Sequence, residues 1–205
     1  SGKTTLGRAI LKAVPISSGK ILFDDSEVSY DIRNISQIDL KNYRKLAQLI
    51  FQDPYAALSP RMTVRDIIAE PLEVMGLTQN REQTDEKVRE IAAKCRLNLE
   101  HLRRFPHAFS GGQRQRISIA RALVCNPDFV VADESVAALD VSIQADILNL
   151  LKSLQSQLGL TFMFISHDLS VVAHICDHVA VMYLGTLVES APTRKLFSNP
   201  RHPYT

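Results

Sequence analysis

The sequence predicts an α/β protein with a mostly parallel sheet at its core and a small helical subdomain. Two apolar runs of strand length, "FVVA" at 129–132 and "LTFMFIS" at 160–166, have the continuous pattern of strands buried on both faces. Segments with helical spacing alternate with these runs, as in a parallel sheet that helices cover on both sides. Between residues 63 and 102 the helical pattern continues without a strand, which indicates the separate subdomain.

The composition is that of an ordinary globular protein. Of the 205 residues, 45% are hydrophobic and 22% are charged, and 24 basic against 22 acidic residues give a net charge of +2. This balance does not favour nucleic acid or an anionic membrane as a partner. No apolar run approaches the ~18 residues that a membrane span needs. Cys95, Cys125 and Cys176 are too far apart for a CxxC site, and their number does not suggest a disulfide framework, which fits a reducing cytosol.

The first quarter of the chain predicts one helix and two strands. The helix covers 5–14, where apolar residues recur at helical spacing, and Pro15 ends it. A strand is expected over 20–24. A short buried strand over 45–51 then leads directly to Gln52.

The second half predicts two long helices and a hairpin. Ser110 is expected as the N-cap of a helix that ends at Asn126-Pro127. A second helix over 143–158 carries isoleucine and leucine on one face and stops at Gly159. The segment "HVAVMYLGTLVE" is typical of a hairpin that turns at Gly185.

These patterns divide the chain into three parts. We expect residues 1–62 to be the first part of a catalytic core, 63–108 to be the helical subdomain, and 109–205 to return to the core.

Residues Ser1-Gly2-Lys3-Thr4 spell the second half of a phosphate-binding loop. The full loop has another glycine five residues before Gly2 and follows a strand, both of which would lie upstream of Ser1. Amides at a helix N-terminus attract phosphate, Lys3 would reach the β- and γ-phosphates, and the Thr4 hydroxyl would bind Mg²⁺. Taken alone, half a motif fits a polar tail equally well.

A second motif places two carboxylates at the end of the predicted strand over 129–132. Burying charge is costly unless something compensates, and a metal ion held by Asp133 would do so. Glu134 could then accept a proton from an attacking water. The alternative is a pair of acids at a solvated strand end, and the upstream half-loop favours the nucleotide interpretation.

The stretch "SGGQRQR" begins at Ser110. Two glycines at a helix start would let the phosphate of another chain approach closely. The alternative is a glycine-rich turn with an N-cap. We interpret the "RQR" run at 114–116 as a short polar helix face and not as an RNA contact.

The order of the motifs decides between these alternatives. Gly2-Lys3-Thr4, then Gln52 after a strand, "FSGGQRQR", "VVADE", "AALD" and "ISHD" follow one another as in the ATP-binding cassette of ABC transporters, a P-loop NTPase fold. The sequence resembles that family over essentially its whole length. "FQDPYAALSPRMTV" and the terminal "RHPYT" are similar to the ATPase subunits of bacterial dipeptide and oligopeptide importers, a group that includes nickel importers.

The resemblance implies a role for each motif residue. The residues that would hold phosphate are Gly2, Lys3, Thr4 and Thr5, and those that would serve Mg²⁺ are Thr4, Gln52 and Asp133. Glu134 would be the general base, His167 would contact the γ-phosphate, and Gln52 would couple this site to the membrane subunit. The residues that would meet the γ-phosphate bound by a partner cassette are Ser110, Gly111, Gly112 and Gln113, and Asp140 would lie at the dimer interface.

The resemblance also implies a function and partners. The chain would be an ATPase that uses ATP and Mg²⁺ to power import of a solute, a dipeptide or oligopeptide, across the bacterial inner membrane. It would lie peripherally on the cytoplasmic face, with a second ABC ATPase subunit in a heterodimer, two transmembrane permease subunits and, indirectly, a solute-binding protein, and without nucleic acid. The alternative is a soluble ABC-type ATPase of translation or DNA repair, but those usually carry two cassettes or long insertions.

Two positions depart from the family pattern, and both ends of the sequence are unusual for it. Ser135 stands where the family usually has proline after the glutamate, and Phe109 where the signature usually begins with leucine. The aromatic residue that stacks on adenine normally lies upstream of the phosphate loop. We therefore expect the chain to be a fragment truncated at both ends, with residues 1–205 inactive alone and binding ATP weakly or not at all.

Overall fold

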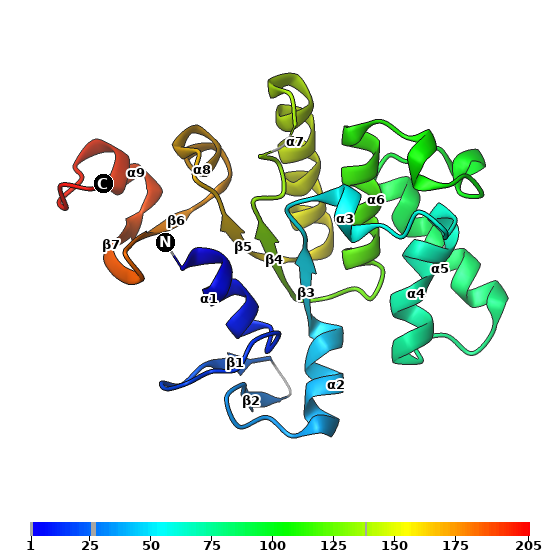
Figure 1. Ribbon diagram of the computed structural model, residues 1–205, viewed down its shortest axis with the longest axis horizontal. Helices are drawn as coiled ribbons and strands as arrows, with labels where there is room; N and C mark the ends of the chain where they lie inside the picture. The colour runs from blue at the N-terminus through cyan, green and yellow to red at the C-terminus, as the bar shows by residue number, and fades with distance from the viewer. Residues whose placement is uncertain (1, 26–27, 138) are drawn as a thin grey trace.

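The computed structural model describes residues 2–25, 28–137 and 139–205, and has a three-stranded parallel sheet at its centre (Figure 1). Its strands, in the spatial order β3-β4-β5, are β3 (Ala47–Ile50), β4 (Phe129–Asp133) and β5 (Thr161–Ile165). Each strand lies at its predicted position, and the parallel arrangement is confirmed.

Strand β4 is buried on both faces, as its apolar run predicts. Val130 and Val131 are both fully buried, and each belongs to a different hydrophobic cluster, because successive side chains of a strand point to opposite faces. The larger cluster joins Val130 to the helices on one face of the sheet. The smaller joins Val131 to Tyr43 and Ile165 on the other.

Strand β5 is less buried than its apolar pattern predicts. Ile165 is buried, but Thr161 is exposed and the residues between them are half-buried. Among the strands that the structure describes, β5 pairs with β4 on one side only. The expectation of a fully buried strand was therefore wrong, because an edge strand shares its surface with solvent.

Helix α1 (Lys3–Ile10) begins and ends earlier than predicted. Lys12 has a left-handed φ of 53°, which breaks the helix before Pro15. The helix packs closely on the sheet: a Cβ added at Gly7 would lie 2.9 Å from Ile165 Cδ1 and 3.0 Å from Val131 Cγ1. Glycine at this position therefore permits the close approach of α1 to the sheet.

A small layer that the sequence predicts only in part covers the same face. Its elements are β1 (Leu22–Asp24), β2 (Ser29–Asp31) and α2 (Gln37–Leu46), and only β1 was expected. Helix α2 starts at an N-cap, Ser36, whose hydroxyl accepts a hydrogen bond from Asp39 N. The Tyr43 hydroxyl donates to Ile10 O at 2.9 Å, and burial raises the pKa of Tyr43 to about 12, so this link to α1 stays neutral.

Helices gather at one end of the sheet (Figure 1). They are α3 (Pro54–Ala57), α4 (Val64–Met75), α5 (Arg81–Lys94), the short 3₁₀ turns η1 (Leu99–His101) and η2 (Pro106–Ala108), and α6 (Gly111–Leu123). The helical pattern expected from 63 to 102 is present. Helix α6 begins at its predicted N-cap, Ser110, and ends three residues before Asn126.

The last part of the chain follows the predicted order of a long helix, a strand and a hairpin. Its elements are α7 (Val141–Leu158), β5, α8 (Leu169–Ile175), β6 (His178–Tyr183), β7 (Thr186–Pro192) and α9 (Thr193–Ser198). Gly159 ends α7 with a left-handed φ of 67°, and Leu184 and Gly185 make the tight hairpin turn with φ values of 47° and 85°. Within the described ranges, no helix has the length and apolar character to cross a membrane.

Candidate functional site

The ends of three parallel strands bring the predicted catalytic residues to one edge of the sheet. Gln52 follows β3, Asp133 ends β4 with Glu134 directly after it, and His167 follows β5. Because parallel strands have their carboxyl ends at the same edge, residues far apart in the sequence meet there. This edge is where open α/β sheets bind ligands.

Thr4 and Asp133 form one part of this site. The Thr4 hydroxyl donates a hydrogen bond to Asp133 Oδ1 at 3.0 Å, although the two residues are 129 positions apart. Gly2, the N-cap of α1, has a φ of 90°, a conformation that favours glycine and turns the chain into the helix. The close packing at Gly7 holds α1 against β4 and β5, so that its N-terminus lies near the carboxyl ends of these strands.

Glu134 is held from two sides. Gln52 Nε2 donates a hydrogen bond to Glu134 Oε2 at 2.8 Å, and His167 Nδ1 lies 3.3 Å from Glu134 Oε1. The Glu134 side chain is 20% exposed, whereas that of His167 is 64% exposed. Each oxygen of the carboxylate therefore has its own neighbour, while one side of the site remains open to solvent.

The backbone of Glu134 is strained. Its φ of 46° is in the left-handed region, which costs a non-glycine residue about 1–3 kcal/mol. The amide of Glu134 donates to Ile165 O at 2.9 Å, and Ala137 N donates to Glu134 O at 3.0 Å. These bonds hold the turn that directs the carboxylate out of the sheet toward Gln52 and His167.

Two of the predicted phosphate-binding residues, Lys3 and Thr5, are not held in this cluster by a hydrogen bond or ion pair among the described residues. Within the described part of the chain, Lys3 and Thr5 have no side-chain hydrogen bond or ion pair, and Thr5 is exposed. Lys3 is half-buried at the first position of α1. Ser1 lies outside the described residues.

The signature residues lie at the start of α6, in a different part of the structure. Ser110 and Gln113 form a capping box: Gln113 N donates to Ser110 Oγ at 3.4 Å, and Gln113 Oε1 accepts from Ser110 N at 3.0 Å. Among the described contacts, none joins this helix start to Glu134. Asp140, at the N-cap of α7, is also exposed and makes no side-chain cap.

The two signature glycines differ in their surroundings. A Cβ added at Gly112 would lie 2.6 Å from Ile143 Cγ2 of α7, whereas at Gly111 the nearest atom would be Leu139 Cδ2 at 3.7 Å. Gly112 is therefore needed for packing within this chain. The sequence predicts either an approach of phosphate to both glycines or a glycine-rich turn with an N-cap, and neither interpretation includes this packing against α7.

Sequence reasoning missed Asp168, which follows His167. Its carboxylate accepts hydrogen bonds from Ser170 N at 2.8 Å and Val171 N at 3.4 Å, so it caps α8. Asp168 N in turn donates to Ser166 Oγ at 3.0 Å. These bonds fix the turn that carries His167. The pattern of an aspartate before an apolar helical segment is the signal that could have identified the cap.

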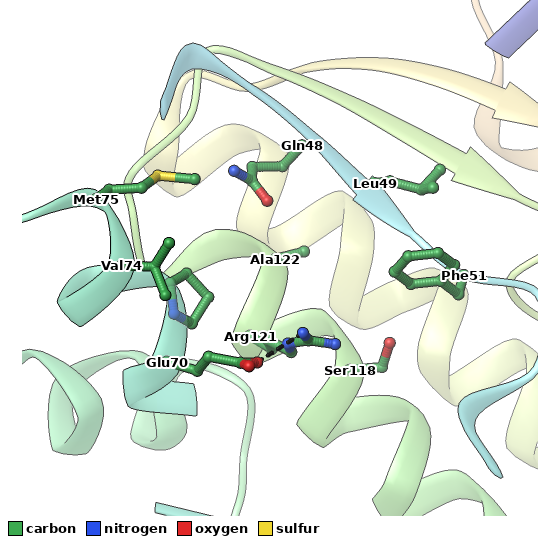
Figure 2. A pocket seen from close by; sticks show the side chains of 10 residues that line it. Gln48, Leu49, Phe51, Glu70, Val74, Met75, Ser118, Arg121 and Ala122 are labelled. Carbon is green, nitrogen blue, oxygen red and sulfur yellow. Dashed lines mark hydrogen bonds and ion pairs between the residues drawn. The ribbon is translucent and has the colours of Figure 1, made fainter. Parts of the chain in front are cut away.

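A groove lies beside the strand that leads to Gln52 (Figure 2). It has a volume of about 340 Å³ and runs between β3, α4 and α6. Phe51 and Val74 line it with 43% and 71% of their surfaces exposed. Its two charged residues, Glu70 and Arg121, pair with each other at 2.7 Å, which leaves the groove close to neutral, and most of its other lining residues are apolar.

Comparison with known proteins identifies the family. The model of the ABC transporter family matches residues 1–137, more than half of the chain. The chain belongs to this ABC transporter family. The sheet, the helical layer and the motif order of this ABC cassette agree with that assignment.

Two relatives of the cassette are peptide transport proteins. It is 50% identical over 204 residues to the oligopeptide transport ATP-binding protein OppF of Bacillus subtilis, and 50% identical over 207 residues to the dipeptide transport ATP-binding protein DppF of Lactococcus lactis. Both alignments cover all of this chain, but it spans 66% and 65% of the lengths of these relatives, just under two thirds.

Solved structures show the same fold. The cassette superposes with a TM-score of 0.83 on cbiO1 from Clostridium perfringens, part of the cbiONQ ABC transporter complex, at 27% identity over 97% of this chain and 75% of that one. It superposes with a TM-score of 0.80 on a dimeric ATP-binding cassette bound to ADP and Pi, at 26% identity over 94% of this chain and 81% of that one. The expected ABC cassette fold is confirmed.

Proposed function

We propose that this chain is the ATP-hydrolysing subunit of a bacterial importer for dipeptides or oligopeptides. The observation that carries the proposal is the position of Glu134, between Gln52 and His167 and beside the Thr4–Asp133 pair, at the carboxyl edge of the parallel sheet. The peptide transport proteins that share half of its residues support the choice of solute.

The nucleotide would lie at the start of α1. Gly2, Lys3, Thr4 and Thr5 would hold its phosphates through backbone amides, the lysine charge and hydroxyls. The residues fit Mg²⁺, because the Thr4 hydroxyl and the Asp133 carboxylate already converge within 3.0 Å and oxygen ligands suit this hard cation. Gln52 would be the third residue, after Thr4 and Asp133, that helps to hold Mg²⁺. When bound, Mg²⁺ supplies positive charge to the phosphates.

Glu134 would act as the general base. Its carboxylate would accept a proton from the attacking water, which requires that one oxygen face the γ-phosphate. Gln52 and His167 hold the carboxylate from both sides and so would fix its direction. The His167 side chain is 64% exposed and would reach the γ-phosphate from the solvent side.

A second cassette would complete the site. Ser110, Gly111, Gly112 and Gln113 lie away from Glu134 within this chain, and their helix start suits an anion that another subunit holds. Asp140, exposed at the start of α7, would lie in the same interface. The dimeric cassette with bound ADP and Pi supports such an assembly, which we propose to be a heterodimer with a second ABC ATPase subunit.

The apolar groove of Figure 2 would receive a cytoplasmic helix of a permease subunit. Phe51, at its edge, directly precedes Gln52, so an occupant would lie next to the site. Residues 63–108, all described and without a strand, would move as a helical subdomain against a core made of 1–62 and 109–205. With two permease subunits and, indirectly, a solute-binding protein, the chain would lie peripherally on the cytoplasmic face of the inner membrane.

The proposal is tested with the complete transporter reconstituted in lipid vesicles. We expect ATP hydrolysis to rise when the solute-binding protein is added with peptide, and peptide to accumulate in an ATP-dependent way. Binding protein added without peptide is the control. Hydrolysis that responds to ribosomes or DNA, and not to loaded binding protein, would instead support the soluble ATPase of translation or DNA repair.

A further inference from the structure

Arginine side chains of α6 contact the short helix that follows Gln52. Arg114 and Arg121 are seven residues apart, which is about two helical turns, so they project from the same side of α6. The guanidinium carbon of Arg114 lies 4.1 Å from the centre of the Tyr55 ring. Arg121 Nη1 donates to Ala57 O at 3.0 Å. Both ends of α3, a helix of four residues, are thus held by α6.

Each guanidinium is also fixed by other groups. Arg114 Nε donates to Pro106 O at 2.8 Å, and its Nη2 donates to His107 O at 3.3 Å. Arg121 Nη2 donates to Glu70 Oε2 at 2.7 Å, the pair drawn in Figure 2. The planar fork of arginine permits several directed bonds at once, which an ammonium group cannot reproduce. The two side chains therefore have fixed directions, and α3 follows the position of α6.

The contact connects the two ends of the proposed active site. Arg114 lies one turn after Ser110, the N-cap that would meet the partner's nucleotide. Tyr55 lies three residues after Gln52, whose amide holds Glu134 at 2.8 Å. A displacement of the α6 start would thus move α3, and through it Gln52 and the Glu134 carboxylate.

We propose that Arg114 and Arg121 are positioning residues that clamp α3 onto α6, so that docking of a partner at Ser110 sets the position of Gln52 against Glu134. This inference rests on the proposed function, because it assigns regulation to the same site. It gives the "RQR" segment a role beyond that of a polar helix face. If the contact served stability alone, its loss would lower the unfolding temperature but would not lower kcat while leaving KM for ATP unchanged.

The test is a double-mutant cycle on the assembled transporter. ATP turnover with peptide-loaded binding protein, KM for ATP and the unfolding temperature are measured for Arg114→Met, Tyr55→Leu and the double variant. We expect each single change to lower kcat about tenfold, since misplaced reacting groups cost up to about 100-fold, with KM within about twofold of wild type. The double variant should be no slower than either single variant.

Two controls separate the clamp from other roles of these residues. Tyr55→Phe keeps the ring and should turn over as wild type does, whereas a loss as large as that of Tyr55→Leu would assign the effect to the hydroxyl and overturn the proposal. Arg116→Met removes an arginine of the same helix that bonds Cys95 O and Asp146, not α3, and should lower the unfolding temperature without lowering kcat.

The remaining outcomes are also decisive. Multiplicative losses in the double variant, to about 100-fold, would mean that the two residues act independently and would overturn the clamp. An equal loss of kcat in Arg116→Met would reduce the effect to stability and would overturn it as well. If peptide-loaded binding protein does not stimulate ATP hydrolysis by the wild-type transporter, the proposed function itself is contradicted. Failure of the clamp and failure of the proposed function therefore give different results.

Discussion

Glu134 combines a strained backbone with a carboxylate whose two oxygens have separate neighbours. Such strain persists only where surrounding structure determines it, and it is concentrated at functional sites. The residues around it were predictable because motifs at the ends of parallel strands must converge. The contact of Arg114 with Tyr55 could not be predicted from the sequence, since neither residue has a local pattern that indicates its distant partner.

Thr4 gives the sharpest test of the cation site. Thr4→Val keeps the shape of the side chain but removes the hydroxyl that donates to Asp133, so we expect the Mg²⁺ concentration for half-maximal ATP turnover to rise by about tenfold or more. Thr4→Ser keeps the hydroxyl and is the matched control. The measurement is a Mg²⁺ titration of turnover by the assembled transporter, and identical titrations for the two variants would rule out a role for Thr4 in holding Mg²⁺.

Helix α6 serves both packing and the proposed site. Its N-cap, Ser110, was predictable from local sequence, because a capping box depends on residues three positions apart. The need for glycine at 112 was not, since it arises from Ile143 of α7. Helix α2 and strand β2 were missed for a different reason: each buries only one or two side chains, and these pack around Tyr43, whose burial the local sequence does not indicate.

The two signature glycines allow a direct test of this packing. Gly112→Ala places its Cβ against the stiff β-branched side chain of Ile143, so we expect the free energy of unfolding to fall by about 1–3 kcal/mol. Gly111→Ala, with ordinary contact distance to Leu139, should be nearly neutral. Denaturant unfolding of both variants is the measurement. Adding Ile143→Ala should relieve the clash, and a loss of stability at Gly111 as large as at Gly112 would contradict the packing assignment.

The two groups of site residues, one around Glu134 and one at Ser110, do not meet within the described chain, which is why we propose that two cassettes complete each other's sites. The order of the motifs in the sequence is enough to predict the residues of each group. Their separation in space follows from the position of α6 beyond β3, on the side of the sheet away from β5 (Figure 1). The sequence motifs predict which residues belong to the Glu134 group and to the Ser110 group, but they do not predict the distance between the two groups.

Ser110 tests this shared site. Ser110→Arg adds bulk and charge at the proposed interface, so we expect the assembled transporter to bind ATP at this chain's own phosphate-binding residues but to fail to close the two cassettes over it, as measured by ATP-dependent cross-linking between them. Ser110→Ala removes the hydroxyl, at a cost of about 1 kcal/mol for the lost cap, but adds neither bulk nor charge, and should impair closure less than Ser110→Arg. Loss of ATP binding by this chain with closure preserved would contradict a site shared between chains.

The most direct test of the whole account is the chemical step in the Glu134→Gln variant. The amide keeps the size of the side chain and can still contact Gln52 or His167, but it cannot accept the proton. In the assembled transporter, we expect ATP to bind nearly as in wild type and single-turnover hydrolysis to fall by roughly 10²–10⁴-fold. Glu86→Gln, at an exposed position of α5, is the control and should hydrolyse ATP normally. Near wild-type hydrolysis by Glu134→Gln would contradict the assignment of the base.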